Sequence, residues 1–498
     1  MARILPKSNH VLRPVPVLLS LLVFLAVIPR SFSQAIATDG DLNNSIRMDV
    51  ECHSGTPPVL EFVLKGPEGA VRFLSFDFES DGKHDVRIDE IQGEVVFRGI
   101  PFRKPGTYRT TVYLYTGEGR FKREFTIAYT DFVWGRDNYQ FANDGKFEDA
   151  SDFVSETLID WAEARFGPLS QEQQVIILSL MYDLYKGSIG RCYGFTGEQT
   201  YYINNPENIS PSYGNIYLIS EEDKDVFRNM DYVQNDIVLS NFLSGKINVS
   251  VPQSRESLLH ELGIIKRSIE QDEAIIMGYL SDRMHHSMVV YGYFENHFRN
   301  KITLLTANNW EREQNNNTYS EDAENIVIEL RGYKPILTWY DLTKKRYRYP
   351  KSIFAVRRED SYRFLHADLD VLINRAAQEF IRDDRAIIMI EKTETAYLID
   401  EEGKKQGYSK PRYFKEIDDV TFKKIDYNYI FQYPAGREFR LVLKKRRYNK
   451  QRDEYKKVNL FSHVPTDDAL RTTIIKDVPV QDETDLVFVV KRDMVHIE

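Results

Sequence analysis

The sequence has little that would hold a protein together by covalent bonds. Only two of its 498 residues are cysteines, Cys52 and Cys192, so a disulfide-rich scaffold is excluded. Glycine and proline number 26 and 19, which excludes a collagen-like chain. The 66 basic residues are outnumbered by 75 acidic ones, for a net charge of -9, so no overall basic field attracts nucleic acid or anionic membranes. We expect neither as a partner.

Long apolar runs are also missing, except near the N-terminus. Basic residues precede an apolar run from Val15 to Ile28, and Ser31 and Ser33 supply the small side chains of a cleavage site after Ser33. The run has about 14 residues, whereas a spanning helix needs about 20. Residues 1–33 therefore predict a secretory signal peptide in preference to an uncleaved anchor. We expect a secreted, extracytoplasmic protein with no integral membrane segment in the mature chain.

The length predicts several domains, since 498 residues exceed one ordinary domain. Residues 41–131 contain short alternating strands with Gly and Pro between them, which is typical of a small antiparallel β-sandwich. Residues 137–347 begin with helical periodicity and end with strands, which predicts an α+β domain. Residues 352–385 form an expected connector with a helix from about Ser361 to Ile381. The strand pattern of residues 386–498 predicts a second sandwich.

The N-terminal module contains a candidate calcium loop. Carboxylates and a glycine follow the spacing of such a loop at Asp77, Glu79, Asp81, Gly82 and Asp85. Position twelve, where a bidentate acid is expected, is Ile88. A solvated acidic turn is therefore the expected reading, calcium stays an alternative, and no other cofactor or metal is expected.

This segment also resembles a known module. The run from Phe76 to Gly82, together with Lys104 to Tyr108, resembles the polycystic-kidney-disease-type immunoglobulin-like modules of secreted proteins. Such modules usually act as spacers or bind partners. The resemblance implies that the β-sandwich domains can contact a cell-surface or extracellular partner.

Two motifs carry the chemistry. The first is Gly190-Arg191-Cys192-Tyr193-Gly194-Phe195, and the second is the run from His285 to Tyr293 about ninety residues later. A thiol attacks as the thiolate, so a catalytic cysteine needs a helix N-terminus and a nearby imidazole. Residues 193–202 could form that helix, His286 could supply the ring from a strand, and Gly190 would let a substrate approach closely.

In this order the motifs resemble papain-fold cysteine peptidases. The segments Gly-x-Cys-Tyr-Gly-Phe, His-Ser-Met-Val-Val-Tyr-Gly-Tyr and Ala307-Asn308-Asn309 are most similar to the secreted bacterial branch related to bacteriocin-processing (double-glycine) peptidases. The resemblance covers residues 137–347. The expected fold class is therefore multi-domain, with a papain-like α+β domain between N- and C-terminal antiparallel β-sandwiches.

The resemblance implies roles for individual residues. Cys192 matches the nucleophile and His286 the general base. Ala307 stands where an acid is expected, so Asn308, or alternatively Asn309, would orient the imidazole. His285 is a neighbour of the site. Lys186 stands where papain-type enzymes carry an oxyanion-hole glutamine, which leaves half of that hole unassigned.

Three functions stay open at this point. The first is a secreted cysteine peptidase that hydrolyses peptide or amide bonds of a protein or peptide substrate. The second is an inactive papain-fold scaffold in an extracellular binding or adhesion protein, and the third is transglutaminase-like acyl transfer. A Cys52–Cys192 bridge would block the thiol, and Asn308 and Asn309 could be plain turn residues.

Overall fold

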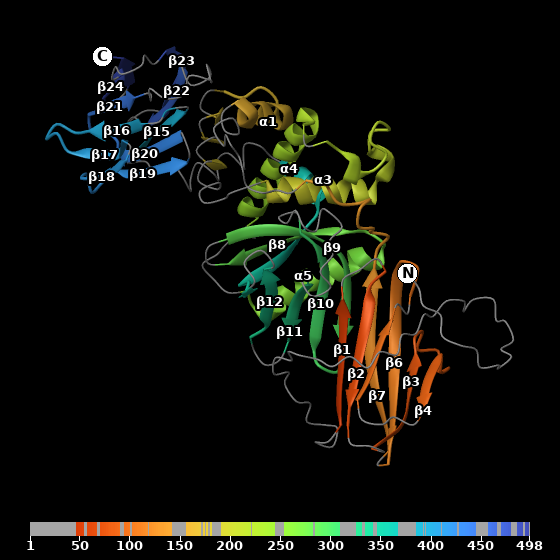
Figure 1. Ribbon diagram of the computed structural model, residues 1–498. Helices are drawn as coiled ribbons and strands as arrows, with labels where there is room; N and C mark the ends of the chain where they lie inside the picture. Colours follow the sequence, from red (N-terminus) through yellow and green to blue (C-terminus); the bar gives the residue numbers. More distant parts are fainter. Residues whose placement is uncertain are drawn as a thin grey trace.

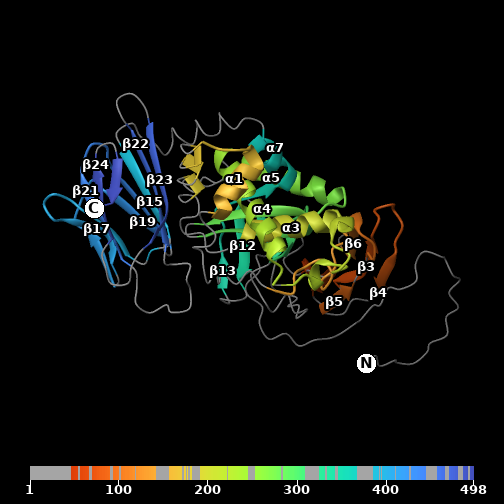
Figure 2. The same cartoon turned by 90° about the horizontal axis from the view of Figure 1, so that it is seen from above.

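The computed structural model describes residues 46–497 with gaps, of which the longest are 142–155, 182–190, 245–252, 309–324, 367–384 and 445–456. The predicted signal peptide lies outside the described residues. The architecture consists of several antiparallel sheets with few helices. Figures 1 and 2 show a helical layer between the C-terminal sheets and the N-terminal strands.

The N-terminal strands form two facing sheets. One contains β1 (Arg47–His53), β2 (Val59–Lys65) and β5 (Glu94–Gly99). The other contains β3 (Val71–Asp77), β4 (Val86–Asp89), β6 (Gly106–Thr116) and β7 (Arg120–Tyr129). Alternate side chains of both sheets, such as Phe62, Phe76 and Leu114, share one apolar core.

The second of these sheets continues into the central part of the chain. Strand β7 pairs with β9, so that β3, β4, β6 and β7 belong to an eleven-stranded sheet. Its other members are β8 (Ile275–Ser281), β9 (Met284–Asn296), β10 (Lys301–Ala307), β11 (Asn325–Glu329), β12 (Ile336–Asp341), β13 (Arg346–Arg348) and β14 (Ser352–Val356). The N-terminal module is therefore joined edge to edge to the central strands, which the sequence did not predict.

Helices cover both faces of the central strands (Figure 1). Helix α5 (Arg255–Glu270) starts at Ser254, whose hydroxyl accepts the Ser257 N–H at 3.1 Å, and buries an apolar stripe against one face. The other face contacts α3 (Cys192–Asn204), with α1 (Glu156–Phe166), α4 (Lys224–Leu243) and α7 (Arg358–His366) beyond it. Short 3-10 turns at Pro206–Asn208 and Ile216–Leu218 connect α3 to α4.

Two features refine the predicted connector. Residues 352–356 pair with β8 and so belong to the large sheet. Helix α7 spans Arg358–His366, earlier than expected, and the rest of the predicted helix lies largely outside the described residues. None of the described helices is long and apolar enough to cross a membrane.

The C-terminal strands form a second pair of facing sheets. One sheet contains β15 (Arg385–Glu391), β19 (Thr421–Ile425), β20 (Asn428–Pro434), β22 (Lys457–Pro465) and β23 (Leu470–Pro479). The other contains β16 (Thr395–Ile399), β17 (Lys405–Ser409), β18 (Arg412–Lys415), β21 (Phe439–Lys444), β24 (Leu486–Lys491) and β25 (Met494–Ile497). Ile388 and Leu398 lie in the core between them, whereas Ile387 belongs to the apolar cluster that contains Trp161 of α1.

Candidate active site

Cys192 is the first residue of helix α3. Its side chain is buried, and Arg191 before it provides no side-chain cap. Backbone N–H groups of the first turn and the positive end of the helix dipole therefore lie beside the sulfur. Neither Cys192 nor Cys52 forms a disulfide, so the alternative of a bridge between them is wrong.

The structure brings His286 and Asn308 together. His286 lies on β9, and Asn308 directly follows β10, the neighbouring strand. The two side chains are buried, with Nε2 of His286 2.8 Å from Oδ1 of Asn308. An amide oxygen only accepts hydrogen bonds, so Nε2 carries the hydrogen and Nδ1 is the nitrogen that takes up a proton. Asn308 thus fixes both the tautomer and the direction of the ring.

Aromatic rings enclose the imidazole. Tyr279, the partner of His286 on β8, meets it edge to face with ring centroids 5.5 Å apart. Trp339 of β12 lies nearly parallel to it at 6.4 Å. The pairing of β8 and β9 in a hairpin could have revealed Tyr279 from the sequence. Trp339 is 53 positions from His286 in the printed sequence, and no local sequence pattern predicts that the two side chains are in contact.

Hydrogen bonds at two places fix α3 along β8 and β9. At the end of the helix, Asn204 donates to the Ala274 carbonyl and accepts the Ala274 N–H, both at 2.9 Å. Near its start, the Thr196 and Ser287 hydroxyls are 2.9 Å apart, and the Thr196 hydroxyl also donates to the Cys192 carbonyl at 2.9 Å. Ser287 is the neighbour of His286. The turn that contains Cys192 is therefore joined to the strand that contains His286.

These contacts show where along the strand Cys192 lies. The helix rises about 12 Å from Asn204 back to Thr196. The chain covers a similar distance along β8, about 13 Å, from Ala274 to Gly278. Gly278 is the partner of Ser287 on β9, so the helix runs alongside the strands. Cys192 lies about 6 Å further along the helix axis, or about two strand residues. It is therefore level with the pair formed by Leu280 and His285, one residue beyond Tyr279 and His286 toward the end of the β8–β9 hairpin.

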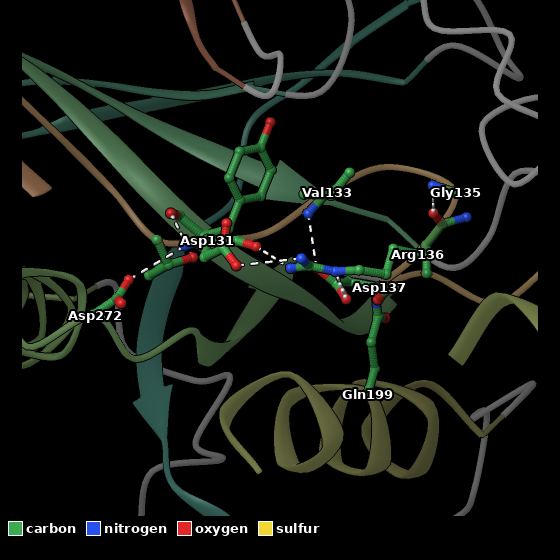
Figure 3. A network of polar contacts seen from close by, with 10 residues as sticks. Asp131, Val133, Gly135, Arg136, Asp137, Gln199 and Asp272 are labelled. Carbon is green, nitrogen blue, oxygen red and sulfur yellow. Dashed lines mark hydrogen bonds and ion pairs between the residues drawn. The ribbon is translucent and has the colours of Figure 1, made fainter. Parts of the chain in front are cut away.

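A turn before α1 contacts the same helix (Figure 3). Asp137 accepts the Val133 N–H at 2.7 Å and forms an ion pair with Arg136 at 2.6 Å. Its carbonyl accepts the buried Gln199 side-chain amide of α3 at 2.8 Å. Burial raises the pKa of Asp137, and Arg136 opposes that shift. The turn fixes α3 at Gln199, about two helical turns after Cys192.

The remaining predicted residues have separate positions. His285 is exposed, while Gly190, Asn309 and Lys186 lie outside the described residues. Two glutamines earlier in the chain than Cys192 do not supply the missing half of the oxyanion hole. Gln173 accepts the Ser170 N–H at 2.9 Å, and Gln174 donates to Glu163 at 3.1 Å. Sequence reasoning missed a third glutamine, Gln234 of α4, which contacts the first turn of α3.

The candidate calcium loop is a turn held by its own carboxylates. Asp77 accepts the N–H groups of Asp81 at 3.0 Å and Gly82 at 2.9 Å, and Asp85 accepts that of Phe78 at 2.8 Å. Lys83 pairs with Asp81 at 2.7 Å. Glu79 is exposed. Within the described part of the chain, no group of three or more His, Cys, Asp or Glu side chains is placed to hold a metal ion.

Comparisons with known proteins assign no family. No family description matches the sequence, and no curated protein is significantly similar to it. The geometry around Cys192, His286 and Asn308 is therefore the basis for a function.

Proposed function

We propose that the protein is an exported thiol hydrolase of the papain type that cleaves peptide or amide bonds. Cys192 is the nucleophile, His286 the general base, and Asn308 the residue that orients the imidazole. The observation that carries the proposal is the 2.8 Å contact between His286 and Asn308, at the level along the sheet that the first turn of α3 reaches. A cysteine outside any disulfide at the start of that helix supports it further.

The reaction follows from these positions. Nδ1 of His286 takes the thiol proton, and the Cys192 thiolate attacks the substrate carbonyl. The Cys192 N–H at the start of the helix faces the developing oxyanion. The imidazolium then gives its proton to the leaving amine as the carbon–nitrogen bond breaks, which leaves a thioester. Water, deprotonated by His286, attacks the thioester and releases the acid and the free thiol.

Strand geometry sets one condition on this proposal. Neighbouring side chains of a strand point to opposite faces, so Ser287 faces α3 while the His286 ring starts on the side of Tyr279. For the proposed chemistry, the thiol and the ring therefore have to meet beyond the end of the β8–β9 hairpin.

Trapping the acyl-enzyme tests the proposal. The full secreted protein is incubated with a fluorescent casein, and turnover is compared with that of Cys192→Ala and of Cys52→Ala, which alters the other buried thiol. We expect hydrolysis by the wild type and by Cys52→Ala, and none by Cys192→Ala. Turnover that persists in Cys192→Ala contradicts the proposal, as does the absence of any acyl adduct on Cys192 by mass spectrometry.

The two other functions give different results in the same assay. Transglutaminase-like transfer incorporates an added amine, dansylcadaverine, into casein faster than water cleaves it. An inactive scaffold gives neither product. N-terminal sequencing of the secreted protein tests export, with Gln34 expected as the first residue after cleavage behind Ser33.

A further inference from the structure

An ion pair lies immediately before the nucleophile. The Arg191 guanidinium contacts Asp231 of α4 through two nitrogens, Nε to Oδ1 and Nη2 to Oδ2, the latter at 3.2 Å. A two-point contact of this kind fixes direction as well as distance. Asp231 is buried, so the pair is shielded from water and salt.

A second contact from the same helix follows one turn later. Gln234 is buried, and its side-chain oxygen accepts the Gly194 N–H at 2.8 Å. Gly194 lies two residues after Cys192. Asp231 and Gln234 therefore hold the residues on both sides of the nucleophile, and Gln234 satisfies one of the donors that a helix start leaves unpaired.

The backbones of α3 and α4 are too close for this arrangement to shift freely. A Cβ atom at Gly194 would lie 2.2 Å from the Met230 carbonyl oxygen, and one at Gly197 would lie 2.3 Å from Val233 Cγ1. Helices packed this closely cannot slide past each other without repacking their side chains. The first turn of α3 thus has one well-defined position against α4.

The charges around Asp231 come from separate elements. Burial raises the pKa of Asp231 to about 6, and Arg191 of α3 opposes that shift. On α4 itself, Arg228 pairs with Asp225 at 2.9 Å. Arg358 of α7 pairs with Glu198 at 3.0 Å, and Arg165 of α1 pairs with Asp236 at 3.1 Å.

We propose that Asp231 and Gln234 are positioning residues for the proposed thiol chemistry, which hold the first turn of α3 so that Cys192 meets His286. This inference rests on the proposed function, because it concerns the same thiol. Neither residue touches the substrate. Each acts through the backbone of α3, and each is a feature of α4 that the sequence motifs around Cys192 do not include.

The pH dependence of alkylation tests this role. The rate of Cys192 alkylation by iodoacetamide is measured from pH 4 to 10 for the full chain, Asp231→Asn, Gln234→Met and Asp225→Asn. If positioning is lost, the thiolate loses contact with His286, and the midpoint of the profile rises by about one pH unit. At pH values below the midpoint, the alkylation rate of Cys192 then falls about tenfold. Removing the Asp231 charge alone would lower the midpoint, because a negative neighbour disfavours the thiolate.

We expect Asp231→Asn and Gln234→Met to raise the midpoint, and Asp225→Asn, an exposed pair on the same helix, to leave it unchanged. An unchanged or lowered midpoint in Asp231→Asn or in Gln234→Met overturns the inference for that residue while the wild type stays reactive. A wild-type Cys192 no faster than a free model thiol overturns the proposed function instead. Protection of the buried Cys52 from alkylation shows that the core around the N-terminal strands of each variant is folded, and Gln234→Met changes no charge.

Discussion

At the scale of single residues, the orientation of the His286 ring depends on one amide oxygen. Asn308 holds the His286 ring through Nε2 at 2.8 Å, and a side chain that cannot accept this hydrogen leaves the ring free to turn and to change tautomer. We expect Asn308→Ala to lower the alkylation rate of Cys192 at pH 7 about ten- to hundredfold, the usual range for a residue that orients a functional histidine. Asn308→Asp keeps an acceptor and should recover part of this loss.

The matched control for Asn308 is another asparagine of the same sheet. Asn325 donates to the Cys52 carbonyl at 3.1 Å, away from His286. If Asn308→Ala and Asn325→Ala lowered the alkylation rate of Cys192 equally, the effect would come from the fold, which would contradict the role given to Asn308.

The same residues show how far the sequence reaches. The order and spacing of Cys192, His286 and Asn308 carried the resemblance, and the structure places His286 and Asn308 in contact. Trp339, Asp231 and Gln234 were out of reach, because their contacts arise when strands or helices distant in the chain pack together. The candidate calcium loop was visible in the sequence, but its function was not. Carboxylates that cap a turn and carboxylates that bind a cation follow the same spacing.

At the scale of secondary structure, the packing of α3 on α4 is the feature that positions the thiol. Gly194→Ala adds a Cβ 2.2 Å from the Met230 carbonyl, and the helices have to separate. We expect the free energy of unfolding to fall by about 1–3 kcal/mol, measured by urea denaturation. Gly263→Ala on α5 is the matched control, because its Cβ meets only the end of Arg267 at 3.6 Å. That change should raise stability by about 0.5–1 kcal/mol.

A Gly194→Ala variant as stable as the wild type would mean that the two helices are not in close contact.

The helix of Cys192 was expected from the sequence to start near residue 193, and it starts at Cys192. Its contact with α4 was not expected. A glycine in a helix is read from the sequence as a source of flexibility, and only the folded structure shows that it allows another backbone to come close.

At the scale of the whole molecule, the N-terminal strands and the central strands share one sheet. The pairing of β7 with β9 supports the shared core, and Arg299 adds a link by donating to the Met48 carbonyl at 3.0 Å and pairing with Asp49. The sequence suggested separate modules because strand patterns show which segments are extended and leave their partners open.

Removing residues 34–130 therefore exposes the edge of β9 and part of its apolar face. We expect this truncated protein to aggregate, since an unpaired central strand recruits other chains. Size-exclusion chromatography and thermal melting measure the effect. A truncated protein that is monomeric and melts at the wild-type temperature would show that the central part is an independent domain.

The central claim is that His286 activates Cys192. The most direct measurement is the midpoint of the pH profile for alkylation of Cys192, compared between the wild type and His286→Ala, with peptide mapping to separate Cys192 from Cys52. The account predicts a wild-type midpoint well below about 8.5, the value of a free cysteine, and a return toward that value in His286→Ala. A wild-type midpoint at or above about 8.5, or one that His286→Ala leaves in place, would contradict it.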